Sequence, residues 1–171
     1  MRDLGGRNAL VTGGSGGIGA YIARALARAG ANVVVSGRRE DALAGVVAEL
    51  HELGVRADAV PADLHDLTQV DSLIDRSEAA LGALDVLVNN AGVENAAEFA
   101  RYTRDELTSM VDLNLTASLL LTHRVLPGML ERGRGHVVFM ASVAGKIGPA
   151  YAAPYAATKA GRVAASRGRA A

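Results

Sequence analysis

The sequence predicts an α/β protein with an open, doubly wound parallel sheet of strand order 3-2-1-4-5. Short apolar runs alternate with longer amphipathic segments along the chain, which is the pattern of βαβ units. The composition is 50% hydrophobic but only 4% aromatic, and buried parallel strands favour small branched side chains. A glycine-rich loop follows the first apolar run, at the position where such folds bind ligands.

Each element has its own sequence signal. Apolar runs predict strands at residues 8–13, 32–37, 56–63, 84–92 and 135–142. Amphipathic patterns predict helices at 17–30, 40–53, 66–81 and 104–132, the last interrupted or bent near Pro127. A further helix should begin at Pro154, because proline is favoured in a first helical turn. Right-handed crossovers then give the strand order, and no linker or repeat divides residues 1–171, so one domain is expected.

Composition and charge exclude several classes of function. The formal net charge is zero with no block of like charge, so neither nucleic acid nor an anionic membrane is expected as a partner. The absence of cysteine excludes disulfides, thiolate metal sites and cysteine nucleophiles. The four histidines have no metal-ligand spacing, and His51 and His65 are expected to be exposed, so no metal is predicted. The start lacks a signal-peptide pattern and the apolar runs are too short to span a bilayer, so a cytoplasmic protein is expected.

The glycine-rich loop is the stretch TGGSGGIG at residues 12–19, between the first predicted strand and the first predicted helix. It satisfies two spacings, G-x-G-x-x-G at Gly14, Gly16 and Gly19 and G-x-x-x-G-x-G at Gly13, Gly17 and Gly19. At a helix N-terminus, backbone N–H groups and the helix dipole attract phosphate, and side chains would block its approach. A tight turn is the structural alternative, but the strand–loop–helix setting favours a Rossmann-type dinucleotide site. No lysine follows in the P-loop pattern, which argues against an NTPase.

The end of the second predicted strand indicates which dinucleotide is bound. An acidic residue there usually holds the ribose 2′-OH of NAD, but this chain has Ser36 and Gly37, followed by Arg38 and Arg39. Two guanidinium groups can bind a 2′-phosphate, so NADP is predicted in preference to NAD. The alternative is that both arginines are solvated charges at the start of a helix, where arginine is poorly suited. Glu40 is better explained as a first-turn charge than as a ribose ligand.

Three further motifs follow in order: NNAG at 89–92, DLNL at 112–115, and a serine–tyrosine–lysine set formed by Ser142, Tyr155 and Lys159. With TGGSGGIG, they resemble the motifs of the short-chain dehydrogenase/reductase family over residues 7–161. The chain is most similar to NADP-dependent 3-ketoacyl-carrier-protein reductases and related carbonyl reductases. The resemblance implies an oxidoreductase that transfers hydride between NADP(H) and a small carbonyl or alcohol substrate. It assigns cofactor contacts to Thr12, Gly13, Ser15, Gly17, Ile18, Gly19, Arg38, Asp63, Leu64, Asn90, Ala91, Gly92, Tyr155 and Lys159.

The tyrosine and lysine of this set suit proton transfer to a carbonyl oxygen. A phenol with an ordinary pKa of about 10 is a poor donor unless a cation favours its phenolate. Lys159 follows Tyr155 by four residues, on the same face of the predicted helix. The resemblance implies that Tyr155 is the general acid/base and that Lys159 also holds the nicotinamide ribose. It further implies that Ser142 binds the substrate oxygen. Asn114 matches the family's asparagine, which bends its helix and relays protons through water beyond the lysine.

The family resemblance stops near the end of the chain. Family members add two more strands, a mobile substrate lid and a closing helix, and the tail GRVAASRGRAA has Val163 as its only sizeable apolar residue. We therefore expect a truncated form with little or no activity by itself. The family forms homo-oligomers through its tyrosine helix and the long helix before it, and assembly of this chain is expected to suffer. The alternative function is a catalytically silent dinucleotide-binding module.

Overall fold

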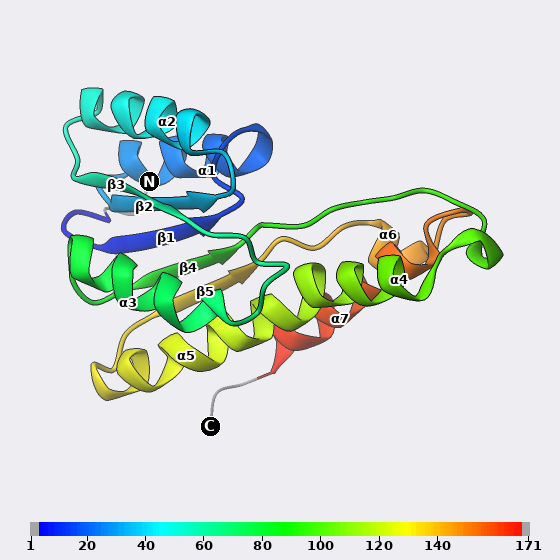
Figure 1. The fold of residues 1–171 in the computed structure, drawn as a ribbon. Helices are drawn as coiled ribbons and strands as arrows, with labels where there is room; N and C mark the ends of the chain where they lie inside the picture. Colours follow the sequence, from blue (N-terminus) through cyan, green and yellow to red (C-terminus); the bar gives the residue numbers. More distant parts are fainter. Residues whose placement is uncertain (1–3, 169–171) are drawn as a thin grey trace.

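A parallel sheet forms the centre of the molecule. The computed structural model describes residues 4–168, and within them five strands run in the order β3-β2-β1-β4-β5, as predicted (Figure 1). Their bounds are β1 Asn8–Thr12, β2 Asn32–Gly37, β3 Ala57–Pro61, β4 Val86–Asn89 and β5 His136–Phe139. All neighbouring pairs are parallel. The carboxyl ends of the strands therefore meet at one edge, where open α/β sheets bind their ligands.

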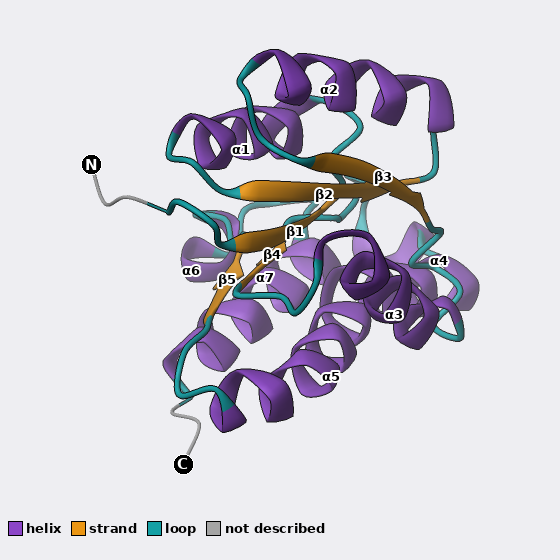
Figure 2. Ribbon diagram, turned by 90° about the vertical axis from the view of Figure 1, so that its left-hand side faces the viewer, coloured by secondary structure: helices purple, strands orange, loops and turns teal. Residues whose placement is uncertain are grey.

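Two layers of helices cover this sheet, giving the predicted Rossmann fold (Figure 2). Helices α1 (Gly17–Arg28) and α2 (Glu40–Glu52) lie on one face, and α3 (Gln69–Leu81) and α5 (Ala117–Glu131) lie on the other. The other helical segments are η1 Phe99–Arg101, α4 Arg104–Val111, η2 Asp112–Thr116, α6 Ala144–Ile147 and α7 Ala153–Arg167. Successive residues of a strand point to opposite faces of the sheet. Leu10 packs in the hydrophobic core between the sheet and α3 and α5, and Val11 packs in the core between the sheet and α1 and α2.

The strands are shorter than their apolar runs predict. Residues 84–92 and 135–142 read as strands, but only Val86–Asn89 and His136–Phe139 pair in the sheet. Beyond Asn89 the backbone changes partners, because the N–H groups of Asn90 and Ala91 donate to the side-chain hydroxyl of Thr12 instead of to a backbone carbonyl of β1. The residues that follow β4 and β5 therefore lie outside the sheet, and several of them line the pockets at its carboxyl edge.

The helical tract predicted at 104–132 is interrupted, but not at Pro127. A π-helical segment, η2, separates α4 from α5 at Asp112–Thr116. Helix α5 continues through Pro127, where the residue and His123 one turn earlier are both exposed. The carbonyl that loses its donor there faces solvent, which lowers the cost of an internal proline.

Helix α7 begins at Ala153, one residue before the predicted start, with Pro154 in its first turn. It packs on α4, α6, η2 and β5. Val163 is only half-buried, whereas Arg162 on the same helix is buried. The sequence predicts weak apolar packing of this helix, and its buried residues do include two cationic side chains, Lys159 and Arg162.

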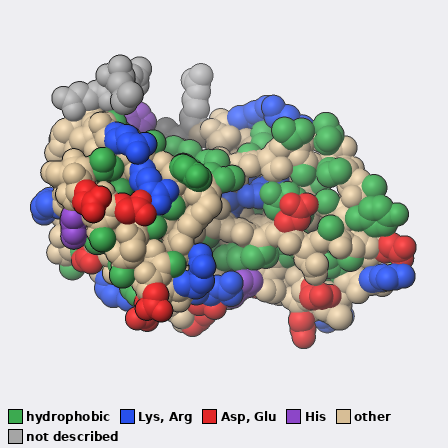
Figure 3. All heavy atoms as spheres, turned by 90° about the horizontal axis from the view of Figure 1, so that it is seen from above, with side chains coloured by type: hydrophobic (Ala, Val, Ile, Leu, Met, Phe, Trp, Pro, Cys, Tyr) green, Lys and Arg blue, Asp and Glu red, His purple; other side chains and the backbone are tan. Residues whose placement is uncertain are grey.

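Strand β5 forms an edge of the sheet among residues 4–168. A groove beside it is lined by apolar residues of α5 and β5, including Leu119, Leu126, Leu130, Val137 and Phe139. At another end of the molecule, over α4 and α6, Figure 3 shows hydrophobic side chains gathered on the surface. The exposed apolar residues of this region are Phe99, Val143, Ile147 and Tyr151.

Candidate functional site

The loop between β1 and α1 is built so that only glycine fits at two of its positions. Gly13 has φ +65°, and a Cβ there would lie 2.9 Å from the Asn90 side-chain nitrogen and 3.0 Å from the Ala91 Cα atom. A Cβ on Gly19 would overlap the carbonyl oxygen of Gly13. The first turn of α1 therefore packs directly on the loop backbone. That turn carries no acidic residue, so its positive end is available to an anion.

Thr12 ties this loop to the chain that follows β4. Its hydroxyl donates to the Val88 carbonyl over 3.2 Å and accepts the N–H groups of Asn90 (3.0 Å) and Ala91 (3.1 Å). The Asn90 amide in turn donates to the carbonyls of Thr12 (2.9 Å) and Gly13 (3.3 Å). Thr12 lines neither of the two pockets at this edge. Its structural role is to hold two loops side by side.

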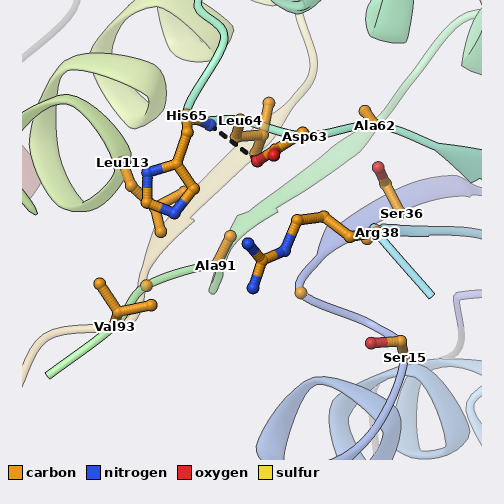
Figure 4. A pocket seen from close by; sticks show the side chains of 13 residues that line it. Ser15, Ser36, Arg38, Ala62, Asp63, Leu64, His65, Ala91, Val93 and Leu113 are labelled. Carbon is orange, nitrogen blue, oxygen red and sulfur yellow. Dashed lines mark hydrogen bonds between the residues drawn. The ribbon is translucent and has the colours of Figure 1, made fainter. Parts of the chain in front are cut away.

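The first pocket lies at the carboxyl ends of β1, β2 and β3 (Figure 4). It is lined by Gly13, Ser15, Ser36, Gly37, Arg38, Ala62, Asp63, Leu64, His65, Ala91, Gly92, Val93 and Leu113. The buried Ser36 hydroxyl has no hydrogen-bond partner in the described structure. Figure 4 shows the Arg38 side chain extending into the pocket. The guanidinium group of Arg38 is thus available to an anionic ligand in this pocket, whereas the Ser36 hydroxyl is buried in its wall.

The two neighbouring arginines have different surroundings. Arg39 donates from Nη2 to the Ser15 carbonyl over 3.0 Å and approaches the Ser15 hydroxyl at 3.5 Å. Arg39 therefore contacts the backbone of the glycine loop, while Arg38 lines the pocket. Of the two arginines, Arg38 is the one that lines the pocket, and its contact with a 2′-phosphate stays a prediction.

Asp63 and His65 form the far wall of this pocket. The Asp63 carboxylate accepts the His65 N–H over 3.1 Å (Figure 4). The His65 ring lies 2.8 Å from the Ser109 hydroxyl and is half-buried. The expectation that His65 is exposed is wrong, because the loop after β3 folds against α4. His51 is exposed, as predicted.

A second pocket continues from the first toward α7. It is lined by Gly13, Gly16, Ile18, Gly19, Asn90, Ala91, Gly92, Val93, Glu94, Met140, Ala141, Tyr155 and Lys159. The Lys159 ammonium lies 5.4 Å from the centre of the Tyr155 ring and donates to the Met140 carbonyl over 2.9 Å. Burial, and then the positive charge of Arg162, lower the pKa of Lys159 to about 8. The predicted tyrosine–lysine pair is therefore assembled at the end of this pocket.

Asn114 lies in the π-helical segment and is completely buried. Its side chain exchanges two hydrogen bonds of 2.8 Å with the backbone of Val93. It also donates to the Thr158 hydroxyl over 3.2 Å. The Asn114 carbonyl accepts the Nε–H of Arg162. Asn114 thus links the loop after β4 to α7. It does so from within the π-helical segment, a type of turn that is frequent at functional sites.

Most of the predicted site residues line one of the two pockets. The exceptions are Thr12, Gly17, Asn114 and Ser142. Gly17 begins α1 with φ +51°, and the Ser142 hydroxyl accepts the Ala144 N–H over 3.2 Å at the start of α6. The ligand contacts expected of all the site residues, those that line the pockets included, stay predictions.

Comparison with known proteins places this architecture in a family. The family model described as short chain dehydrogenase matches residues 7–170. The chain belongs to the short-chain dehydrogenase family.

A curated relative and two solved structures are similar to this short-chain dehydrogenase. A ketoacyl reductase of Nostoc sp. is 42% identical over 95% of this chain and 57% of its own length. A 3-oxoacyl-(acyl-carrier-protein) reductase of Agrobacterium tumefaciens, solved with NADP bound, has 36% identity and a TM-score of 0.88, covering 93% of this chain and 61% of that one. An actinorhodin polyketide ketoreductase solved with NADPH has 41% identity and a TM-score of 0.88, over 92% and 61%. This chain thus spans about three fifths of these relatives.

Sequence reasoning missed several groups in this short-chain dehydrogenase. They are Arg162, the Met140 carbonyl, Thr158 and the unpaired Ser36 hydroxyl. Arg162 lies three residues after Lys159 and therefore on the same helix face, which is the one signal that could have identified it. A carbonyl group carries no sequence signal at all, since its position depends on where β5 ends.

Metal-binding clusters and membrane-spanning helices are both absent from the described part of the chain. Among residues 4–168, no group of three or more histidine or acidic side chains is placed to hold a metal ion. The helices of the same part of the chain include none that is both long and apolar enough to cross a membrane.

Proposed function

We propose that this protein is an NADP(H)-dependent oxidoreductase that interconverts a carbonyl compound and its alcohol. The observation that carries the proposal is that the two pockets adjoin and share part of their lining. Gly13, Ala91, Gly92 and Val93 line both of them. The combined site runs from Arg38, past the glycine loop, to Tyr155 and Lys159. An elongated site with an arginine at one end and a phenol–ammonium pair at the other suits a phosphorylated dinucleotide and a reacting carbonyl.

The residues present fit such a cofactor. Its pyrophosphate would lie on the loop from Gly13 to Gly19, at the N-terminus of α1, whose first turn carries no acidic residue. Arg38 would bind the 2′-phosphate, and Asp63 and Leu64 would face the adenine. When bound, the nicotinamide supplies or accepts the hydride. The NADP and NADPH in the two related reductases support this choice over NAD.

In this proposal the chain's own residues manage the proton and the substrate oxygen. Tyr155 donates its phenolic proton to the oxygen during reduction and takes one back during oxidation. The adjacent Lys159 charge favours the phenolate that remains and binds the ribose. Ser142 would hydrogen-bond the substrate oxygen, and Asn114 would support Lys159 through the loop after β4. The relatives' names favour β-ketoacyl thioesters as the first substrates to assay.

A second candidate is a catalytically silent dinucleotide-binding module. It is favoured by Ser142, which does not line the pocket that holds Tyr155. The apolar residues Val143, Ile147 and Tyr151 near this side are 68%, 70% and 62% exposed, so water has access to the region. For that reason we expect turnover by this chain to be slow, since reaction requires well-oriented groups.

The test compares Tyr155→Phe with the parent protein in NADPH oxidation and NADPH binding. Loss of the phenolic proton should reduce turnover by about 100-fold or more, with cofactor affinity nearly unchanged. Tyr151→Phe is the matched control, because Tyr151 is exposed and lines neither pocket. Parental turnover in Tyr155→Phe would contradict the assigned role. NADPH binding without turnover of any carbonyl by the parent chain would favour the silent module.

A further inference from the structure

Arg162 is among the most deeply buried side chains of the described structure, with 1% of its surface exposed. Its guanidinium group donates only to backbone carbonyls. Nη1 donates to Asn89 over 3.0 Å and to Met140 over 3.1 Å, Nη2 donates to Ala91 over 2.7 Å, and Nε donates to Asn114. These carbonyls come from the ends of β4 and β5, the loop after β4 and the π-helical segment. One side chain thus joins four segments, of which the loop after β4 and the residues after β5 line the second pocket.

No carboxylate among residues 4–168 forms an ion pair with Arg162. A buried cation without a counter-ion is costly, and such groups are retained mainly where hydrogen bonds satisfy them fully. The fixed fork of a guanidinium group matches several carbonyls at once, which a lysine ammonium does not. Arg162 therefore fixes the positions of four carbonyl oxygens, while the burial of its charge lowers the free energy of unfolding.

Arg162 and Lys159 share one of these acceptors. The Met140 carbonyl accepts the Lys159 ammonium at 2.9 Å and the Arg162 guanidinium at 3.1 Å. Lys159 is itself only 5% exposed. Two buried cations are therefore held against one oxygen, beside the Tyr155 ring.

The charges around Lys159 come from several elements. Arg162 on its own helix lowers the pKa of Lys159, and Glu94 in the loop after β4 raises it, both after the larger effect of burial. The charged residues of the other elements packed on α7 are Arg104, Asp105 and Glu106 of α4, Asp112 of η2, His136 of β5 and Lys146 of α6; Asp112 is half-buried and the others are exposed. Tyr155 is the remaining titratable group beside this pair.

We propose that Arg162 is a positioning residue. Its guanidinium group fixes α7 against the ends of β4 and β5 and, through the shared Met140 carbonyl, sets the place and the charge state of Lys159. The catalytic meaning of this inference rests on the proposed function, because Lys159 acts there as the partner of Tyr155. The physical claim about Lys159 does not depend on turnover.

The sequence offers a direct measurement, because Lys146 and Lys159 are its two lysines. Protein labelled with ¹³C at the lysine ε-carbon gives two lysine resonances, whose titration reports each ammonium separately. Lys146 is exposed and serves as the internal reference. Lys159 should titrate near its lowered pKa of about 8.

The variant Arg162→Gln removes the charge while keeping hydrogen-bond donors. Without the nearby cation, the pKa of Lys159 should rise by about 1 pH unit, since burial continues to oppose its charged form. Arg167→Gln makes the same change at an exposed position of the same helix, and it should leave the Lys159 titration unchanged. Equal shifts in both variants, or no shift in Arg162→Gln, would overturn the inference.

A second measurement on the parent protein covers the case in which Arg162→Gln does not fold. The Arg162 Nε–H, held on the buried Asn114 carbonyl, should exchange slowly with water and show a contact to Asn114 in NMR spectra. A slowly exchanging Nε–H together with the low Lys159 titration supports the inference. Fast exchange, or a Lys159 that titrates with Lys146, refutes it. An inactive parent with these NMR features would count against the proposed function alone.

Discussion

Arg38 and Arg39 are adjacent in the sequence, yet they contact different parts of the site. Arg38 lines the first pocket, whereas Arg39 donates to the Ser15 carbonyl on the outside of the glycine loop. The charge available to a 2′-phosphate therefore depends on Arg38, and the shape of the pyrophosphate loop depends partly on Arg39. This separation makes the cofactor preference testable one side chain at a time.

Arg38→Ala should weaken NADPH binding by about 10–100-fold, because a hydrogen bond to a charged group contributes about 1.5–3 kcal/mol. NADH binding should change little, since NADH has no 2′-phosphate. Titration of both dinucleotides by isothermal calorimetry measures the difference. Arg39→Ala is the matched control and should weaken both cofactors to a similar extent through the loop. An unchanged ratio of NADPH to NADH affinity in Arg38→Ala would contradict the assignment.

The glycine loop and helix α1 act as one element. Because Gly19 packs on the Gly13 carbonyl, a methyl group at residue 19 must push the helix away from the loop. This contact explains why the first turn of α1 can present its backbone N–H groups close to a ligand.

Gly19→Ala should lower the free energy of unfolding by about 1–3 kcal/mol, as overpacking of a close contact does, and should abolish NADPH binding. Gly45→Ala in α2 is the control, because no atom lies within 4 Å of a Cβ placed there. It should instead stabilise the protein by about 0.5–1 kcal/mol, since alanine is the better helix former. Urea unfolding of the three proteins gives the comparison. A neutral Gly19→Ala would show that the loop can relax.

At the scale of the whole molecule, the lowered pKa of Lys159 couples folding to pH. The ordinary lysine pKa of 10.5 falls to about 8 in the folded protein. Between these values the unfolded chain binds more protons, so stability rises with pH. Below pH 8 the cost of the buried charge is fully present, and it is relieved as pH increases toward 10.5.

The urea midpoint of the parent protein should therefore increase between pH 8 and pH 10, measured in buffers of equal ionic strength. Lys159→Met keeps the apolar stem without the charge, and its midpoint should be less dependent on pH across this range. Parallel curves for the two proteins would show that the Lys159 ammonium is not destabilised by the fold.

The sheet edge at β5 predicts self-association. The groove beside it carries the apolar residues of α5 and β5, and Leu130 is 54% exposed. Unpaired edges with apolar surroundings tend to pair with other chains. Sedimentation at increasing protein concentration should show association that Leu130→Lys reduces. Leu53→Lys, at the end of α2, changes a leucine that lies outside this groove and should not reduce it. Equal association of both variants would exclude this face.

The sequence by itself determined the order of strands, the glycine loop and the tyrosine–lysine pair. Each of these follows from local information: apolar periodicity, the turn chemistry of glycine, or the four-residue spacing that places Tyr155 and Lys159 on one helix face. Local reasoning placed the helix break near Pro127, because the side-chain contacts that accompany the π turn at Asn114 have no local signal. A bend at Asn114 is implied by the family resemblance alone.

Only the tertiary structure decided how the pieces of the site are held. Arg162 reads in sequence as a polar residue near the end of a poorly apolar helix, but in the fold it reaches carbonyls 22 to 73 residues away. Those oxygens lie close together because the ends of β4 and β5 meet the middle of the π-helical segment. The separation of Arg38 from Arg39 has the same origin, since it depends on where the loop after β1 lies. Backbone acceptors have no sequence pattern, so contacts to them become visible only when distant segments meet.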